Sequence, residues 1–356
     1  MAVTGLETEV PFLAAAGGRA TPVTPVWFMR QAGRYMEEYR AIRAHHTLLQ
    51  ICARPDLAAE VTLQPVRKLG VDAAILFADI LLPLVPMGLE LDFVSGEGPR
   101  IANPIRLASQ VDALRPVDPA ADLGPVLETI RLLRRQLEPR TPLIGFVGGP
   151  FTVATYAIEG GPSRHLLESK RMMYQAPELW HRLLSALARV LADFLVAQAD
   201  AGAQALQVFD SWAGQLSETD YRQYVLPHSR ALFDRLATTG VPRIHFGVGT
   251  DHLLEAMTEA GGDVIGLDWR TPLDRGWTRV GQRAIQGNLD PVALFAPLPE
   301  LRRRVFDVLE RAGGRPGHIF NLGHGILPDT PVDRVRAVVD MVHQYHAEGE
   351  NRCERR

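Results

Sequence analysis

Two arginines four residues apart are the first groups in this chain that could bind an anion. Arg30 and Arg34 lie in the segment WFMRQAGRYMEEYR, residues 27–40, directly after an apolar run. Arginine stays charged, and its planar fork of donors suits carboxylates or phosphates. The same spacing also occurs on solvated turns whose arginines are ion-paired. The segment therefore predicts either such a surface turn or a site for a ligand with several anionic groups.

Asp79 is an acidic residue in an apolar setting, the stretch ILFADILL at residues 75–82. Burying its charge without a partner is expensive, so the carboxylate must meet hydrogen-bond donors. If the donors are loop amides, Asp79 is structural. If they are the N–H groups of a ligand, Asp79 is functional.

Three further polar residues are ambiguous on their own. His324 lies between two glycines, which permit sharp turns and close approach of a ligand, yet a lone histidine is more often a loop or capping residue. Tyr156 could simply pack with its hydroxyl on a carbonyl. Ser211 could simply cap a turn after a strand.

The elements that must position these side chains alternate between short apolar strands and helical stretches. Eight strands are predicted, at residues 25–29, 73–77, 143–147, 205–209, 243–246, 264–267, 283–286 and 318–321. Helical spacing of apolar residues predicts helices at residues 55–69, 123–137, 177–199, 217–237, 250–260 and 299–311. Alternating strands and helices pair in parallel through right-handed crossovers. We therefore predict an α/β fold, a (β/α)8 barrel.

The polar residues fall where such a barrel places its functional groups. They follow predicted strand ends: Arg30, Asp79, Asp210 with Ser211, Asp268, Asn288 with Asp290, and His324. Active sites of these barrels are built from loops at the carboxyl ends of the strands. The side chains are therefore expected to converge at one mouth.

Composition excludes several classes of protein. A formal net charge of -3 over 356 residues, without a polybasic stretch, argues against nucleic-acid binding. No apolar run is long enough to span a membrane, and an acidic N-terminus argues against secretion. With only Cys52 and Cys353, we expect no disulfide framework or metal site and a reducing cytoplasm. The glycine-rich segments 145–149 and 247–249 complete no nucleotide-binding fingerprint.

Six short blocks resemble the uroporphyrinogen decarboxylase family, and they occur in the family's order. They are RQAGRY at residues 30–35, FADI at 77–80, TYAIEG at 155–160, FDSWAG at 209–214, GNLDP at 287–291 and NLGHG at 321–325. The resemblance covers nearly the whole chain. The departures are modest: Met36 and Glu37 replace a frequent Leu-Pro, and Ala78 replaces a frequent serine.

The resemblance implies an activity, an architecture and an assembly. The family removes CO2 from the four acetate side chains of uroporphyrinogen III, giving coproporphyrinogen III in heme biosynthesis. It implies one distorted TIM barrel over residues 1–356 with short flexible tails at both ends, a cytoplasmic homodimer, and no membrane partner. No cofactor is expected, because a pyrrole protonated at carbon can itself accept the electrons left by CO2.

The resemblance also implies the site residues. Substrate contacts are expected at Arg30, Gln31, Ala32, Arg34, Arg43, Asp79, Tyr156, Ser211 and His324. Asp79 and Arg30 are the expected catalytic residues: the carboxylate stabilises positive charge on the pyrrole, and Arg30 clamps a substrate carboxylate and can take part in proton delivery. Tyr156 and Ser211 are expected to hydrogen-bond propionate or acetate groups.

Two alternatives stay open. One is a corrinoid-dependent methyltransferase of the same superfamily, which binds zinc through a His-x-Cys arrangement and a later cysteine; Cys52 and Cys353 form no such arrangement. The other is a tetrapyrrole carrier, which would bind a porphyrinogen without releasing CO2. Analysis of the products separates the carrier from the decarboxylase.

Overall fold

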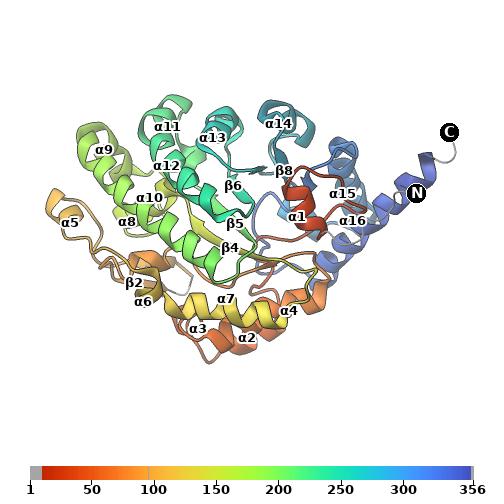
Figure 1. The fold of residues 1–356 in the computed structure, drawn as a ribbon, viewed down its shortest axis with the longest axis horizontal. Helices are drawn as coiled ribbons and strands as arrows, with labels where there is room; N and C mark the ends of the chain where they lie inside the picture. The colour runs from red at the N-terminus through yellow and green to blue at the C-terminus, as the bar shows by residue number, and fades with distance from the viewer. Residues whose placement is uncertain (1–9, 95, 354–356) are drawn as a thin grey trace.

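The computed structural model describes residues 10–94 and 96–353. Its central element is a curled sheet of seven parallel strands among these residues, in the order β1-β4-β5-β6-β7-β8-β9 (Figure 1). The strands are β1 (Ala74–Ile75), β4 (Leu143–Gly148), β5 (Ala205–Asp210), β6 (Arg243–Gly247), β7 (Val264–Gly266), β8 (Ala284–Gln286) and β9 (His318–Ile319). Each overlaps a predicted strand, so seven of the eight predicted strands are confirmed in position.

The predicted strand at residues 25–29 is wrong as a strand. Only Val26 pairs there, through an isolated parallel bridge to Phe320. On its other side, the Val26 N–H donates to a carboxylate oxygen of Asp72 at 2.7 Å, while the Asp72 N–H donates to the Val26 carbonyl at 2.8 Å. Because Pro25 lacks an N–H and a side chain takes the place of a backbone acceptor, the ladder stops after one bridge.

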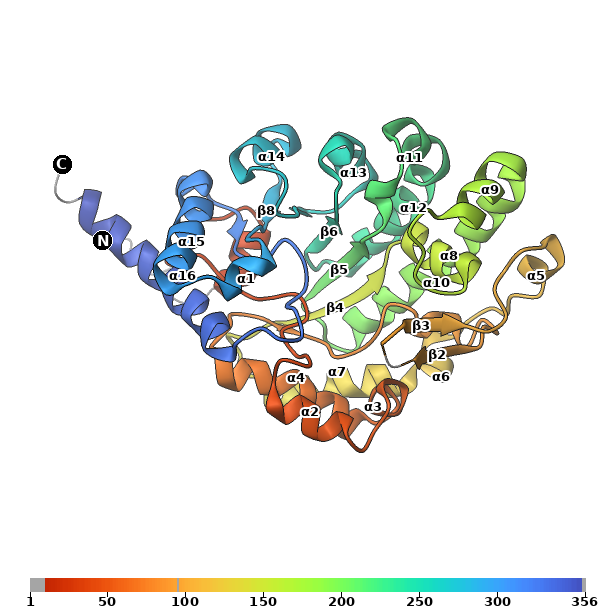
Figure 2. The same cartoon turned by 180° about the vertical axis from the view of Figure 1, so that it is seen from behind.

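Helices flank the outside of the curled sheet, as both ribbon views show (Figure 2). Predicted helices are confirmed at α4 (Pro55–Leu69), α7 (Gly124–Gln136), α10 (Pro177–Asp200), α13 (Leu254–Ala260) and α15 (Leu298–Ala312). The predicted helix 217–237 is instead two helices, α11 (Glu218–Tyr224) and α12 (Leu226–Leu236). Pro227 causes this break, because it has no N–H to continue the helix from α11.

Several elements were not predicted. They include the short helices α1 (Pro11–Ala16), α2 (Glu37–Arg43), α3 (Leu48–Cys52), α5 (Ala108–Asp112) and α6 (Pro119–Asp122), the helices α8 (Pro150–Glu159), α9 (Leu167–Gln175), α14 (Leu273–Val280) and α16 (Val332–Cys353), and the antiparallel hairpin β2 (Leu91–Val94) and β3 (Gly98–Ile101). The backbone of α16 covers most of the predicted C-terminal tail, and the predicted N-terminal tail lies outside the described residues. No helix in the described part of the chain could cross a membrane.

Gln198 on α10 completes the sheet where β1 is too short. The two residues of β1 pair with Leu143 and Ile144 of β4. Beyond that point, the Gln198 side-chain amide accepts from the Phe146 N–H at 2.9 Å and donates to the Phe146 carbonyl at 3.1 Å. Gly145 leaves room for this amide, since a Cβ there would lie 2.5 Å from Gln198 Oε1. A side chain thus replaces a neighbouring strand.

Replacing Gln198 by methionine tests this arrangement. Gln198→Met keeps the shape but leaves two buried backbone groups without partners, and we expect a loss of about 2–4 kcal/mol in the free energy of unfolding. Denaturant unfolding measures this loss. The exposed Gln223→Met on α11 is the control, with an expected change within about 0.5 kcal/mol. Equal effects of the two substitutions would contradict this role of Gln198.

Candidate functional site

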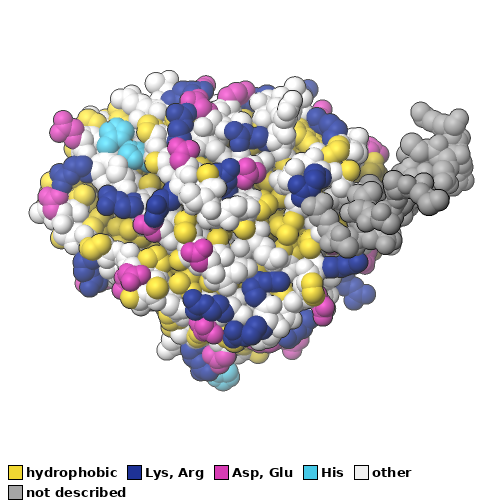
Figure 3. All heavy atoms as spheres, viewed as in Figure 1, with side chains coloured by type: hydrophobic (Ala, Val, Ile, Leu, Met, Phe, Trp, Pro, Cys, Tyr) yellow, Lys and Arg dark blue, Asp and Glu magenta, His cyan; other side chains and the backbone are white. Residues whose placement is uncertain are grey.

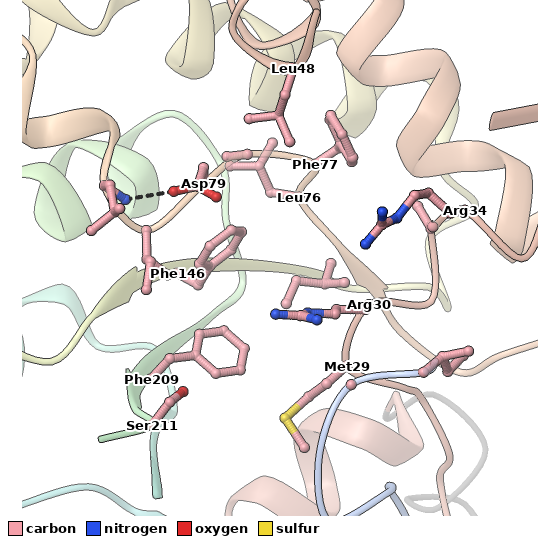
Figure 4. A pocket seen from close by; sticks show the side chains of 18 of the residues that line it. Met29, Arg30, Arg34, Leu48, Leu76, Phe77, Asp79, Phe146, Phe209 and Ser211 are labelled. Atoms are coloured by element: carbon pink, nitrogen blue, oxygen red, sulfur yellow. Dashed lines mark hydrogen bonds between the residues drawn. The ribbon is translucent and has the colours of Figure 1, made fainter. Parts of the chain in front are cut away.

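A cavity of about 400 Å³ opens at the carboxyl ends of the strands. Its walls come from the turn after residues 25–27, the segment after β1, the ends of β4 and β5, and the loop after β9 (Figure 4). Seven of the nine predicted site residues line it: Arg30, Ala32, Arg34, Asp79, Tyr156, Ser211 and His324. Of the polar residues after predicted strand ends, four line the cavity, Arg30, Asp79, Ser211 and His324, and four do not, Asp210, Asp268, Asn288 and Asp290.

Arg30 extends into this cavity from a turn that is locked to the loop after β9. Its backbone is left-handed, with φ 58°, a conformation that costs energy for a residue with a side chain. The Ile326 N–H donates to the Met29 carbonyl at 3.0 Å. Gly325 lies directly under the Arg30 side chain, and a Cβ at position 325 would overlap its Cδ. Figure 4 shows the guanidinium groups of Arg30 and Arg34 both directed into the cavity.

Asp79 lies on the opposite side of the cavity from these arginines (Figure 4). Its Oδ1 accepts a hydrogen bond from the Leu81 N–H at 2.9 Å, and no second bond to the carboxylate occurs among the described residues. Burial raises the pKa of Asp79 to about 6, although the Leu81 amide and the charge of Arg30 oppose this shift. The carboxylate therefore offers an oxygen to a ligand in a poorly solvated place, and it is mostly ionised at pH 7.

The charges of Arg30 and Asp79 also contribute to the pKa shifts of His324 and Tyr156. Burial, followed by the positive charge of Arg30, lowers the pKa of His324 to about 4, so its ring is neutral at pH 7. Burial and then the charge of Asp79 raise the pKa of Tyr156. The Tyr156 ring packs on Trp212 with a centroid distance of 4.9 Å. With the Ser211 hydroxyl, these groups supply neutral hydrogen-bonding partners around the charged residues.

Gln31 and Arg43, also predicted as substrate contacts, lie outside the cavity lining. The Gln31 side chain is fully buried, accepts from the Phe28 N–H at 3.2 Å and donates to the Ala73 carbonyl at 3.2 Å. It thereby holds the turn that carries the two arginines. Arg43 donates to the His46 carbonyl, and its charge acts on Tyr39, which does line the cavity. Gln31 and Arg43 thus act on residues of the cavity lining without lining the cavity themselves.

Apolar residues of the cavity were not predicted from the sequence. Phe146 and Phe209 meet edge to face with centroids 5.5 Å apart, and both line the cavity. The sequence did contain a signal for these two residues, because both are aromatic residues near the carboxyl ends of predicted strands. Phe93 and Pro99 come from the β2–β3 hairpin, which strand periodicity over so few residues does not indicate.

No group of three or more His, Cys, Asp or Glu side chains in the described part of the chain could hold a metal ion. Cys52 is buried, and burial raises the pKa of its thiol to about 12. It is therefore a neutral thiol behind the cavity wall. The expectation that the site uses no metal or cofactor stays a prediction.

Comparison with known proteins identifies the family. A family model described as uroporphyrinogen decarboxylase (URO-D) matches residues 7–345. A uroporphyrinogen decarboxylase from Sorangium cellulosum is 58% identical over 93% of this chain and 95% of its own length. One from Thermus thermophilus is 55% identical over 94% of this chain and 98% of its own length. The chain therefore belongs to the uroporphyrinogen decarboxylase family.

A solved structure shares the fold at low sequence identity. A methyltransferase from Methanosarcina mazei superposes with a TM-score of 0.80 at 19% identity, covering 94% of this chain and 97% of its own. At this identity the likeness concerns the curled α/β architecture alone. The methyltransferase alternative gains no support from it.

The burial of Asp79 predicts a pH-dependent stability. A carboxyl whose pKa is raised on folding destabilises the folded state above its unfolded pKa of about 4, most fully above the folded value of about 6. Asp79→Asn should therefore unfold with a free energy about 3 kcal/mol higher than the wild type at pH 8. This advantage should shrink as the pH falls through 6 towards 4. Denaturant unfolding across this range, with the exposed Asp329→Asn as control, measures it. A pH-independent difference would contradict the shift.

Proposed function

We propose that this protein is a carboxy-lyase that converts uroporphyrinogen III to coproporphyrinogen III by removing CO2 from its four acetate side chains. The main support is the environment of Asp79, whose carboxylate accepts one hydrogen bond among the described residues and lies in a largely apolar cavity opposite Arg30 and Arg34. Membership of the uroporphyrinogen decarboxylase family supports it. A substrate with many carboxylates and inward N–H groups matches both halves of this cavity.

In this proposal, the two arginines clamp substrate carboxylates while Asp79 accepts hydrogen bonds from the pyrrole N–H groups. Protonation of a ring carbon then makes the pyrrole cationic. When the bond between the acetate methylene and its carboxylate breaks, CO2 leaves and the electron pair flows into the cationic ring. Protonation of the methylene gives a methyl group, and loss of the added ring proton restores the pyrrole.

We expect the charge of Asp79 to make the largest contribution to stabilising the transition state. Its charge is strong in a poorly solvated cavity and is already in place before the pyrrole cation forms, so the transition state gains more than the ground state. Arg30 is proposed as a carboxylate clamp first and a proton donor second, since a guanidinium is a weak acid. The neutral ring of His324, the Tyr156 phenol and the Ser211 hydroxyl are proposed to hydrogen-bond substrate side chains.

We also propose that the whole chain acts as one barrel domain, closed through residues 25–27, and forms a cytoplasmic homodimer. Three exposed apolar side chains lie around the start of α15: Val292 and Phe295 precede the helix and Leu298 is its first residue. Exposed Leu327 adjoins cavity-lining Pro328. Covering such side chains would favour self-association. Sedimentation at working concentrations tests the dimer, and a species that is monomeric throughout would contradict it.

Turnover by Asp79→Asn tests the proposed chemistry. Wild-type protein incubated anaerobically with uroporphyrinogen III should yield coproporphyrinogen III on chromatography. Asp79→Asn should keep its fold and most of its substrate affinity while kcat falls by at least about a hundredfold, because the lost interaction acts chiefly in the transition state. Near-normal kcat in the folded variant would remove Asp79 from the mechanism. A wild type that binds the substrate without forming product would be a carrier.

Substitutions of the two arginines test the clamp. Arg34→Lys keeps the charge but loses the planar fork, so KM should rise about tenfold with a smaller change in kcat. Arg30→Lys should lower kcat as well if Arg30 also delivers a proton. Equal effects at both positions would favour a clamp role alone. Unchanged constants for Arg34→Lys would make Arg34 a surface residue. The exposed Arg140→Lys is the control for charge-preserving replacement.

A further inference from the structure

Asp210 is a second buried carboxyl near the cavity, and the proposed chemistry does not use it. It is the last residue of β5 and is fully buried, and it does not line the cavity. Burial raises its pKa to about 6, while the hydroxyl and the backbone amide of Thr152 act to lower it. A carboxyl kept in such a place needs a structural reason, because an unpaired buried charge is costly.

The surroundings of Asp210 show that it occupies the capping position of another element. Helix α8 begins with Gly149 as its N-cap residue and Pro150 in its first turn, and Gly149 has no side chain to bond the free amides. A Cβ on Gly149 would lie 2.7 Å from the Asp210 carboxyl carbon. The carboxyl of Asp210 therefore fills the space that an N-cap side chain would take. Its negative charge also suits the positive end of the helix dipole.

Thr152 connects this cap to the cavity wall. Its hydroxyl donates to Asp210 Oδ1 at 2.8 Å and accepts from the Trp212 N–H at 3.2 Å. One turn further along α8, Tyr156 lines the cavity and packs on the Trp212 ring. The residue before Trp212 is Ser211, whose side chain also lines the cavity. These contacts connect Asp210 to Tyr156 on α8 and to Ser211 after β5, two residues of this part of the cavity wall.

We propose that Asp210, acting through Thr152, is a positioning residue that caps α8 from β5 and fixes Tyr156 and Ser211 for substrate binding. The role rests on the proposed function, because these two side chains are there assigned to bind substrate. The second oxygen of Asp210 has no hydrogen-bond partner among the described residues, and the Asp210 charge, after burial, raises the pKa of Tyr221. Asp210 therefore depends on Thr152 for the contacts it makes here.

The experiment compares Thr152→Val, which removes the hydroxyl, with Thr152→Ser, which restores it. The matched control is Thr129→Val on α7, because Thr129 is also buried and lies away from the cavity. Within the described part of the chain its hydroxyl bonds the Pro125 carbonyl of its own helix. All variants are full-length protein. The readouts are KM and kcat for uroporphyrinogen III and the hydrogen exchange of the α8 amides by mass spectrometry.

For Thr152→Val we expect KM to rise about tenfold with kcat within about threefold, because the displaced groups bind ground and transition states alike. The α8 amides should exchange faster. Thr152→Ser should return both readouts to within about twofold of the wild type. A purely structural loss would lower the folded fraction, and hence apparent kcat, without raising KM.

The proposal is overturned if Thr152→Val matches Thr129→Val in KM, or if its α8 amides exchange as in the wild type. Asp210→Asn separates charge from shape: it keeps an acceptor for Thr152, so KM should change by less than in Thr152→Val. A larger change in KM for Asp210→Asn would overturn the route through Thr152. If the wild type releases no CO2, the proposed function fails, while the exchange of α8 still decides whether Asp210 and Thr152 cap this helix.

Discussion

The site depends on a carboxylate that the protein holds in poor solvation with few partners of its own. Among the residues that the structure describes, Asp79 receives one backbone hydrogen bond, and it faces a largely apolar cavity, so its ionised form destabilises the folded chain. The positive charge of Arg30 relieves part of this cost. A ligand that brings N–H donors, and a cation during reaction, would relieve more. In the proposed mechanism, the same poor solvation that makes the Asp79 charge unfavourable in the free protein would make it effective towards a bound pyrrole.

The surrounding fold serves this arrangement through close backbone approaches. Gly325 lets the Arg30 side chain cross the loop after β9, Gly145 admits the Gln198 amide to Phe146, and Gly149 gives its capping space to Asp210. In each case a missing side chain on one element makes room for a polar or charged side chain from another. The cavity is therefore defined by contacts between segments that are distant in the sequence. For that reason, a substitution behind the wall can change binding without touching a ligand.

Much of this was predictable from the sequence, and the exceptions have physical causes. Strand periodicity located seven strands, and the polar residues Asp79, Ser211 and His324 after three of them line one cavity, because parallel strands end at the same edge. Asp210, Asp268, Asn288 and Asp290 also follow predicted strands but do not line it. Residues 25–29 have the composition of a strand, but Pro25 and the Asp72 side chain limit the pairing to one bridge. Gln31 belongs to the family's signature, yet its amide is used internally. Pairing and side-chain direction depend on tertiary contacts that no local pattern encodes.

The most direct test of the central claim is the titration of Asp79 itself, followed by carbon-13 NMR of labelled aspartate carboxyls and assigned by comparison with Asp79→Asn. We expect the Asp79 carboxyl to titrate near pH 6 in the free protein. Binding of the octacarboxylate macrocycle should lower that pKa, because pyrrole N–H donors stabilise the ionised form. An Asp79 that titrates at the ordinary value of about 4, and does not respond to the ligand, would contradict the claim that a poorly solvated charge at this position drives the chemistry.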